Sequence, residues 1–214
     1  LGTVISNLMR PKAAPLMKQG DYEVAGIWPI GAIFLYVRDR NVNTTEKLAG
    51  KKIATLSYDQ AAITMVRQVG ASMVASEVSN FAGKFNNGNV DALYAPASAY
   101  KALELYRGIG KNGGVIRYPI AQLTQQLFIR SADFPDGFAQ SARGFAKKTF
   151  NAARRGVQSA EKQIPTASWI DIPASDKVRY DEMFRDVRLT LRDKKKVYAK
   201  KALRLMRKVR CKAD

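Results

Sequence analysis

Two short segments, 48–56 and 85–93, constrain the fold of this chain more than any other feature. Segment 48–56 reads Leu-Ala-Gly-Lys-Lys-Ile-Ala-Thr-Leu, which is typical of a helix end stopped by glycine and followed by a short apolar strand. Segment 85–93 reads Phe-Asn-Asn-Gly-Asn-Val-Asp-Ala-Leu and has the same order of features. Between them lie apolar residues at helical spacing: Ala62, Met65, Val66 and Val69. A strand, a crossover helix and a returning strand predict an α/β lobe with a mostly parallel sheet.

Four motifs keep a fixed order along this region. They are Gly50-Lys51-Lys52-Ile53, Val69-Gly70-Ala71, Ser76-Glu77-Val78 and Gly88-Asn89-Val90-Asp91. Their order and spacing resemble the periplasmic solute-binding proteins of TRAP (tripartite ATP-independent) transporters, a C4-dicarboxylate-type family. The resemblance covers about residues 20–170. It implies an α/β, type II periplasmic-binding-protein-like fold of two lobes, with mixed, mostly parallel sheets and some N-terminal elements missing.

The resemblance also predicts how the chain is divided. The expected segments are 1–50 (remainder of the first lobe and crossover), 51–122 (second α/β lobe), 123–165 (return strand and long closing helix) and 166–214 (basic helical segment). The sequence begins at Leu1 without a recognisable signal peptide, so we expect a processed or trimmed protein, or a fragment.

Local patterns predict individual elements within these segments. Aromatic and β-branched residues predict a strand at 32–38, after a break at Pro29. A helix is predicted at 99–106. Near the C-terminus, Ser175 or Asp176 is expected to cap the next helix.

Composition and charge narrow the class of protein. Apolar residues make up 46% of the 214 residues, which indicates a globular chain, and no apolar run approaches the roughly 20 residues that span a bilayer. The net charge is +18, and ten basic residues against one acidic residue lie between Lys194 and Asp214. Such a tail suits nucleic-acid phosphates. It equally suits an amphipathic helix that docks on the body with a solvated basic face, with apolar residues at Val197, Leu203, Met206 and Val209.

Catalysis has little support in the residue types present. The chain has no histidine, so the commonest general base and metal ligand is missing. The adjacent acids Asp181 and Glu182 do not share a helix face. We therefore expect no enzyme activity, no metal and no cofactor. The single cysteine, Cys211, is either a free thiol or pairs with a residue outside this sequence, and we favour the second interpretation.

Ligand binding is better supported, because ligands of open α/β sheets bind beyond the carboxyl ends of the strands. Hydroxyl, amide and aromatic groups follow two predicted strands, and more amides lie on a strand expected to pass the cleft. The candidate ligand-binding residues are Tyr58, Asp59, Gln60, Tyr94, Ser98, Gln122, Gln125 and Arg130. Each of them also has an ordinary interpretation as a loop residue, a helix cap or a tyrosine packed at the sheet rim.

The chain departs from the resembled family at two positions. Where that family places an arginine that clamps the ligand carboxylate, this sequence has Ala54. Where it places an asparagine contact, this sequence has Ala95. Arg38, Arg67 and Arg130 are the candidates for a replacement charge, and Arg130 at the end of an apolar strand is preferred.

Three functions compete on these grounds. The favoured one is an extracytoplasmic, periplasmic solute-binding protein that captures a small polar or anionic ligand in an interlobe cleft for a membrane transporter. The alternative is an interaction protein that has lost its ligand and serves an envelope or efflux assembly. A nucleic-acid-binding protein is the third and least expected, because Tyr198 is the one aromatic residue of the basic tail.

Overall fold

The structure, a computed structural model, describes residues 2–210, and the chain divides into two compact units. Unit 1 consists of residues 1–31, 122–159 and 201–214, and unit 2 of residues 32–121 and 160–200. Each unit is therefore assembled from stretches that are distant in the sequence. Strand β2 (Tyr22–Val37) and helix α6 (Phe138–Lys162) contribute residues to both units. Of the segments expected from the sequence, 51–122 lies in unit 2 up to Ala121.

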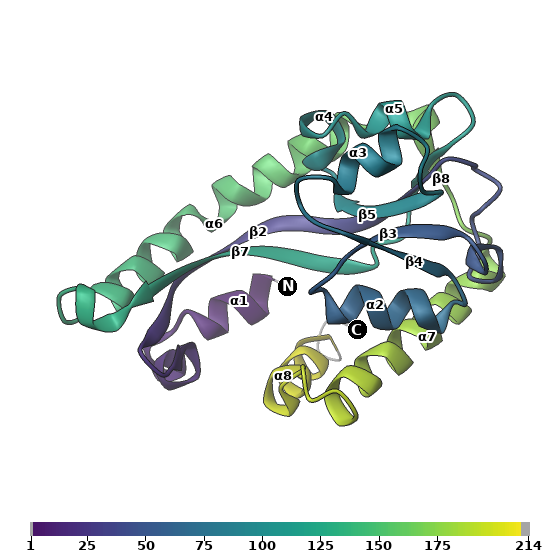
Figure 1. Ribbon diagram of the computed structural model, residues 1–214. Helices are drawn as coiled ribbons and strands as arrows, with labels where there is room; N and C mark the ends of the chain where they lie inside the picture. The colour runs from purple at the N-terminus through teal and green to yellow at the C-terminus, as the bar shows by residue number, and fades with distance from the viewer. Residues whose placement is uncertain (1, 211–214) are drawn as a thin grey trace. The chain divides into compact units, whose positions relative to one another are not determined.

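Unit 2 is built around a mixed sheet (Figure 1). Besides β2, its strands are β3 (Lys52–Leu56), β4 (Ser72–Ser76), β5 (Ala92–Pro96), β6 (Gly114–Ile116) and β8 (Trp169–Ile170). Neighbouring strands follow the order β4-β3-β5-β2-β6-β8. β3 is parallel to β4 and β5, β6 is parallel to β8, and β2 is antiparallel to β5 and β6. All strands of this order except β2 thus run in one direction, and the predicted α/β fold with a mostly parallel sheet is confirmed.

The β3–α2–β4 unit forms where the glycine-stopped pattern predicts it. Gly50, with φ of 73°, follows the one-turn helix η2 (Glu46–Leu48). Helix α2 (Gln60–Gln68) is capped by the Asp59 carboxylate and is followed by Gly70, with φ of 66°. Positive φ is readily adopted by glycine and disfavoured for other residues, so both glycines end their helices sharply.

Helices cover both faces of this sheet (Figure 1). On one face α2 packs against α7 (Ala174–Asp193), and on the other lie α3 (Phe81–Asn86), α4 (Ala99–Ala102) and α5 (Leu105–Ile109). A further one-turn helix, η4 (Thr166–Ser168), precedes β8. The core of unit 2 lies between these layers and includes Tyr36, Val66, Phe85, Leu93 and Tyr180.

The single helix predicted at 99–106 is wrong, because two short helices occupy this region. Glu104 separates α4 from α5 with φ of 51°, a left-handed conformation that a continuous right-handed helix does not contain. The break reorients the chain so that Leu105 and Ile109 are buried in the core of unit 2. Burial of these two side chains outweighs the local preference for one helix.

The predicted cap at Ser175 or Asp176 is also wrong. Helix α7 begins at Ala174, and Pro173 occupies the capping position. Proline is tolerated there because the first N–H groups of a helix have no intrahelical partner. Asp176 instead lies in the first turn, where the helix dipole stabilises its carboxylate.

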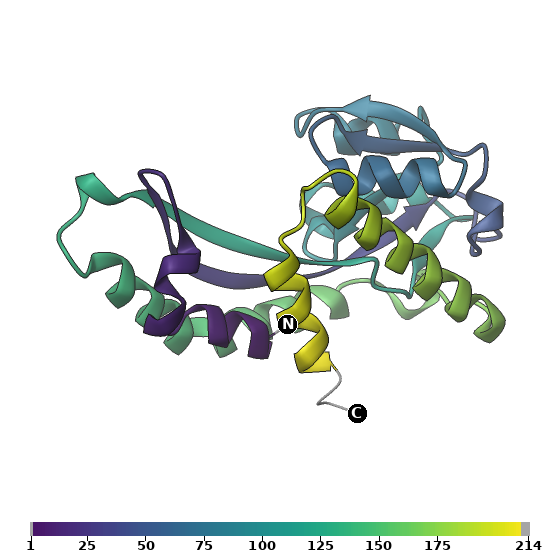
Figure 2. The ribbon, with the colours of Figure 1, turned by 90° about the horizontal axis from the view of Figure 1, so that it is seen from below.

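Unit 1 combines long strands with one long helix. The first part of β2 pairs with β1 (Lys18–Gln19) and with β7 (Ala121–Arg130), and Figure 2 shows β7 beside β2. Helix α6 packs against β2, where Trp28 Nε1 donates a hydrogen bond to Thr149 Oγ1 at 2.8 Å. The remaining elements of this unit are α1 (Gly2–Leu8), η1 (Pro11–Met17), η3 (Ser131–Asp133) and most of α8 (Lys200–Arg210).

Strand β2 is longer than the strand predicted at 32–38. It starts at Tyr22 and passes through Pro29 without a break. Proline holds φ in a range compatible with extended backbone and lacks only the amide donor, so a strand accepts it where that donor is not needed. At Gly31, φ of 115° lets the strand continue while the Val157 side chain approaches the backbone closely.

Within residues 2–210, no helix combines the length and the apolar character that crossing a membrane requires. Cys211, whose bonding the sequence leaves open, lies outside the described residues.

Candidate functional site

The carboxyl ends of the parallel strands β3, β4 and β5 form one edge of the sheet in unit 2. Leu56 pairs with Ser76 in the parallel register, so the segments that follow both residues start side by side. Polar residues follow all three strand ends: Ser57 to Gln60 after β3, Glu77 after β4 and Ser98 after β5. We call this set the carboxyl edge.

Asp59 and Tyr94 hold the carboxyl edge together. Asp59 Oδ1 accepts hydrogen bonds from the backbone N–H groups of Ala61 at 3.1 Å and Ala62 at 2.9 Å, which caps α2. Its second oxygen, Oδ2, accepts a hydrogen bond from the Tyr94 hydroxyl at 3.0 Å. Tyr94 Oη in turn accepts a hydrogen bond from the Leu56 amide at 3.3 Å. The end of β3, the start of α2 and strand β5 are thus joined through two side chains.

Burial keeps the Tyr94 hydroxyl protonated. Tyr94 is only 7% exposed, and its ring meets the Phe81 ring edge to face at 5.4 Å between centroids. Burial raises the pKa of the Tyr94 hydroxyl far above its usual value, and the negative charge of Asp59 raises it further. Tyr94 therefore remains a proton donor at physiological pH. The pKa of the Tyr198 hydroxyl is raised in the same way. Burial is the larger cause, and the negative charge of Asp59 adds to it.

A second group at this edge was not predicted from the sequence. Ser57 Oγ donates to the carbonyl of Ser76 at 3.1 Å and is hydrogen-bonded to the carboxylate of Glu77. Lys84 Nζ donates to Ser76 Oγ at 3.3 Å and also to the carbonyl of Ala75. The carboxyl-edge rule applied to β4, as to β3 and β5, points to Glu77, whereas Lys84 reaches the edge from α3 and has no local signal.

The other predicted residues of unit 2 present free groups to solvent. Tyr58 is 63% exposed, and Gln60 and Ser98 are exposed as well. The structure therefore brings five of the predicted residues to one unit: Tyr58, Asp59, Gln60, Tyr94 and Ser98. In that group Asp59 and Tyr94 are engaged with each other, and the remaining three point polar groups outward.

The predicted residues Gln122, Gln125 and Arg130 lie on β7 in unit 1, and all three are exposed. The Arg130 guanidinium lies 5.8 Å from the centroid of the Tyr22 ring, and its NH1 is 3.9 Å from a carboxylate oxygen of Asp133. Its charge is thus partly balanced within the same unit.

The two positions of the missing family contacts are buried in unit 2. Ala54 is fully buried on β3, opposite Val74 of β4, and Ala95 is buried on β5, opposite Phe34 of β2. Of the other candidate cations, Arg38 donates from NH1 to the carbonyls of Phe85 at 3.0 Å and Gly108 at 3.2 Å. Arg38 is therefore committed to the backbone of unit 2.

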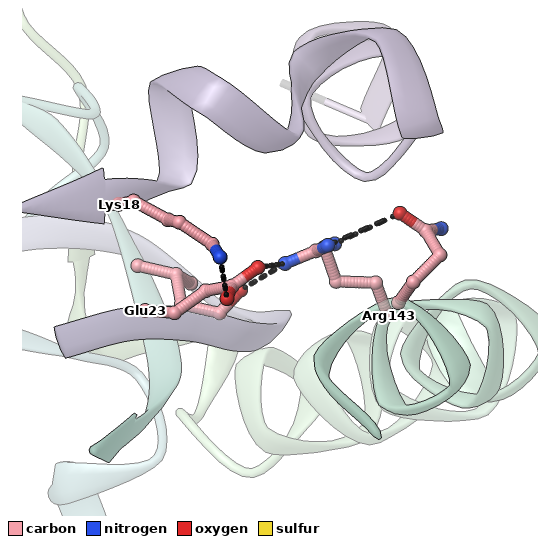
Figure 3. Close-up of polar contacts among 5 residues, drawn as sticks. Lys18, Glu23 and Arg143 are labelled. Atoms are coloured by element: carbon pink, nitrogen blue, oxygen red, sulfur yellow. Dashed lines mark hydrogen bonds and ion pairs between the residues drawn. The ribbon is translucent and has the colours of Figure 1, made fainter. Parts of the chain in front are cut away.

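Unit 1 contains a buried ion pair that the sequence did not reveal (Figure 3). Arg143 of α6 is 2% exposed and Glu23 of β2 is 5% exposed, and Arg143 NH1 lies 2.7 Å from Glu23 Oε1. Lys18 Nζ lies 3.3 Å from the second oxygen of Glu23. Burial alone raises the pKa of the Glu23 carboxyl, but hydrogen bonds from Arg143 and Lys18 bring it below its usual value. The pair joins α6 to β2.

Unit 1 also carries an open apolar groove of about 450 Å³. Its lining residues are Leu16, Met17, Lys18, Gln19, Tyr22, Val24 and Phe128. None of them is among the predicted ligand-binding residues.

The amino-acid sequence of the chain matches a known protein family. Residues 1–214 match the family described as "Solute-binding protein AdeT 1/2". The probable solute-binding protein AdeT1 of Acinetobacter baumannii is 39% identical over 207 residues, which are 97% of this chain and 68% of AdeT1.

Solved structures of TRAP periplasmic solute-binding proteins share the fold. One from Ralstonia eutropha H16, with bound (S)-2-acetolactate, superposes with a TM-score of 0.73 at 14% identity, over 96% of this chain and 69% of that one. One from Shewanella oneidensis, with bound succinate, has a TM-score of 0.73 at 12% identity, over 95% and 69% of the two chains. The resemblance read from the four sequence motifs is confirmed.

Proposed function

This chain belongs to the solute-binding protein AdeT 1/2 family, a TRAP-type family, and on that premise we propose which solute it captures and with which residues. The solute is a small molecule with hydroxyl and carboxylate groups, bound in the periplasm and passed to a membrane transporter. The role is binding and delivery, without a catalytic step.

One observation carries the proposal: the carboxyl edge presents free polar groups on a rigid frame. Asp59 and Tyr94 use their polar atoms on each other and on the backbone, so they position the edge. Tyr58, Gln60 and Ser98 are exposed around that frame and supply a phenol, an amide and a hydroxyl. Such groups recognise a small polar ligand through a few oriented hydrogen bonds.

The charge of the chain favours an anionic solute. With +18 overall, the protein attracts anions and repels cations over long range. The Shewanella and Ralstonia neighbours hold carboxylates. Because Ala54 and Ala95 stand at the positions of the usual carboxylate contacts, we propose a ligand with a single carboxylate and several hydroxyls.

Thermal unfolding against a panel of metabolites tests this proposal. The panel contains hydroxy monocarboxylates, dicarboxylates, amino acids, neutral sugars and cationic drugs. A ligand at about 100 times its Kd stabilises the folded protein by roughly 2.7 kcal/mol, which raises the midpoint measurably. We expect the shift to be largest for the hydroxy monocarboxylates.

Paired variants then test the site. Tyr58→Phe removes one proposed hydrogen bond and is expected to weaken the ligand about two- to tenfold. Tyr106→Phe is the matched control, because Tyr106 is also exposed in unit 2 but lies on α5, where its hydroxyl contacts Glu104. Equal effects of both variants would refute the assignment of the carboxyl edge.

The presence of Ala54 and Ala95 in place of the usual ligand contacts also supports a second candidate function. A chain without the usual clamp residues suits an interaction protein of an envelope or efflux assembly, built on the binding-protein fold. A folded protein that responds to no member of the panel would favour this alternative.

A further inference from the structure

In helix α8 (Lys200–Arg210), residues 200–209 separate into two faces. At 3.6 residues per turn, its apolar side chains fall within about 160° of the helix circumference. They are Ala202, Leu203, Leu205, Met206 and Val209. The opposite face carries only basic residues: Lys200, Lys201, Arg204, Arg207 and Lys208.

The apolar face of α8 is only partly covered. Met206 is 45% exposed, and Leu203, Leu205 and Val209 are half-buried. The hydrophobic core clusters of the described residues contain no side chain from this helix. The docked amphipathic helix expected from the sequence thus exists as a helix, but its apolar face is not part of a core.

The surrounding charge is of one sign. From Lys194 to Arg210 the sequence has nine basic residues and no acidic residue. The acid that precedes this stretch, Asp193, is paired with Arg192 at 2.5 Å. Among the described side chains of α8, residues 200–209, none forms an ion pair with a carboxylate.

We propose that α8 binds the surface of an anionic lipid membrane. A helix with a basic face and an apolar face lies in the plane of the interface, with the apolar side chains among the acyl chains and the cations among the headgroups. Anionic lipids attract each nearby lysine or arginine. This role is independent of the proposed solute site.

The apolar face of α8 favours a membrane over nucleic acid or a second copy of the chain as the binding partner. Duplex or single-stranded nucleic acid would engage the cations but leave Leu203, Leu205 and Met206 without a partner, and the stretch offers only Tyr198 for stacking. A second copy of α8 could cover the apolar face, but it would place two purely basic segments side by side, and like charges oppose that. A membrane of acidic lipids offers acyl chains to the apolar face of α8 and anionic headgroups to its basic face.

Vesicle co-sedimentation of the full chain tests the proposal. Vesicles of phosphatidylcholine mixed with phosphatidylglycerol should bind the protein at low salt, and pure phosphatidylcholine should bind it far less. Each basic residue near an anionic surface changes partitioning about fivefold, so Arg204→Glu with Lys208→Glu should reduce binding at least about 25-fold. Met206→Gln should weaken binding without changing its dependence on salt.

A matched control uses a second basic pair. Lys147→Glu with Lys148→Glu lowers the net charge by the same amount on exposed positions of α6, and it should leave binding nearly unchanged. Circular dichroism and the thermal midpoint confirm that each variant is folded. Equal binding to both vesicle types, equal loss in both charge variants, or no loss with Met206→Gln would overturn the proposal. Displacement from the vesicles by a duplex DNA competitor at equal salt would also overturn it, in favour of nucleic acid.

Discussion

Replacing Arg143 with methionine tests how unit 1 holds its long helix to its strand. Methionine keeps most of the apolar stem but removes every hydrogen bond of the guanidinium. Those bonds reach Glu23 Oε1 at 2.7 Å, the Val24 carbonyl at 3.0 Å, and Gln140 Oε1 at 3.1 and 3.4 Å. The variant leaves a buried carboxylate with Lys18 as its remaining partner, at 3.3 Å.

The expected loss is large because the charge that remains is buried. Removing one partner of a buried ion pair costs about 3–5 kcal/mol, mostly from the uncompensated charge. Lys18→Ala removes the other cation of Glu23, but the Lys18 side chain is 55% exposed, so its loss should cost about 0–1 kcal/mol. The free energy of unfolding should therefore fall several times further in Arg143→Met than in Lys18→Ala.

The pH dependence follows from the pKa of Glu23. In the folded protein this pKa lies below its unfolded value of about 4.3, so the pair stabilises the fold above that pH, and the stabilisation is lost as pH falls toward the folded pKa. Without Arg143, burial outweighs the effect of Lys18 and raises the pKa of Glu23. Protonation of Glu23 then removes the buried negative charge and so reduces the destabilisation of the variant. The difference in stability between the two proteins should accordingly shrink below about pH 4.

Urea unfolding measures these differences unit by unit. The chain has two tryptophans, Trp28 in unit 1 and Trp169 in unit 2, so a Trp169→Phe background makes fluorescence report on unit 1. The double variant Arg143→Met with Glu23→Leu should recover most of the loss, because it removes the buried charge. The reasoning fails if Arg143→Met costs no more than Lys18→Ala, or if the double variant is as unstable as the single one.

Further predictions concern the carboxyl edge and two glycines. Asp59→Ala should lower stability by about 1–3 kcal/mol in denaturant unfolding, because α2 loses its cap and the buried Tyr94 hydroxyl loses its acceptor; a cost equal to that of an exposed alanine substitution would contradict this. Gly108→Ala should destabilise by about 1–3 kcal/mol, since a Cβ there overlaps the ring of the fully buried Phe85. Gly144→Ala, inside α6 with no atom beyond the adjacent helical backbone within 4 Å of the added Cβ, should instead raise stability by about 0.5–1 kcal/mol. Calorimetric midpoints that move in the same direction for both glycine variants would contradict this pair of predictions.

Local signals predicted the part of the fold that local chemistry determines. Glycines 50 and 70 end their helices because their φ angles are positive, and the apolar spacing of α2 is read directly from the chain. The break at Glu104 was missed because its left-handed conformation is imposed by the burial of Leu105, and no residue type at that position indicates it.

The rule for strand ends selected residues by their position in the sequence and gave no information on their contacts. It named Asp59 and Tyr94, but it did not indicate the hydrogen bond that joins them across 35 residues of sequence. The Glu23–Arg143 pair had no signal at all, because its members are 120 residues apart and each alone resembles an ordinary surface charge. Contacts of this kind depend on the pairing of distant segments, which one sequence does not reveal.

The discontinuous make-up of the two units bears on how the protein is made. Unit 1 is formed from three separate stretches of the chain, residues 1–31, 122–159 and 201–214. At ribosomal rates its first stretch waits roughly 10–40 s for the last one to be synthesised. The apolar side chains of Ile27 and Trp28 lack α6 and its Ala146, against which they pack in the finished fold, until the growing chain has passed that helix. The nascent chain therefore exposes these apolar side chains for longer than a protein whose units follow one another along the chain.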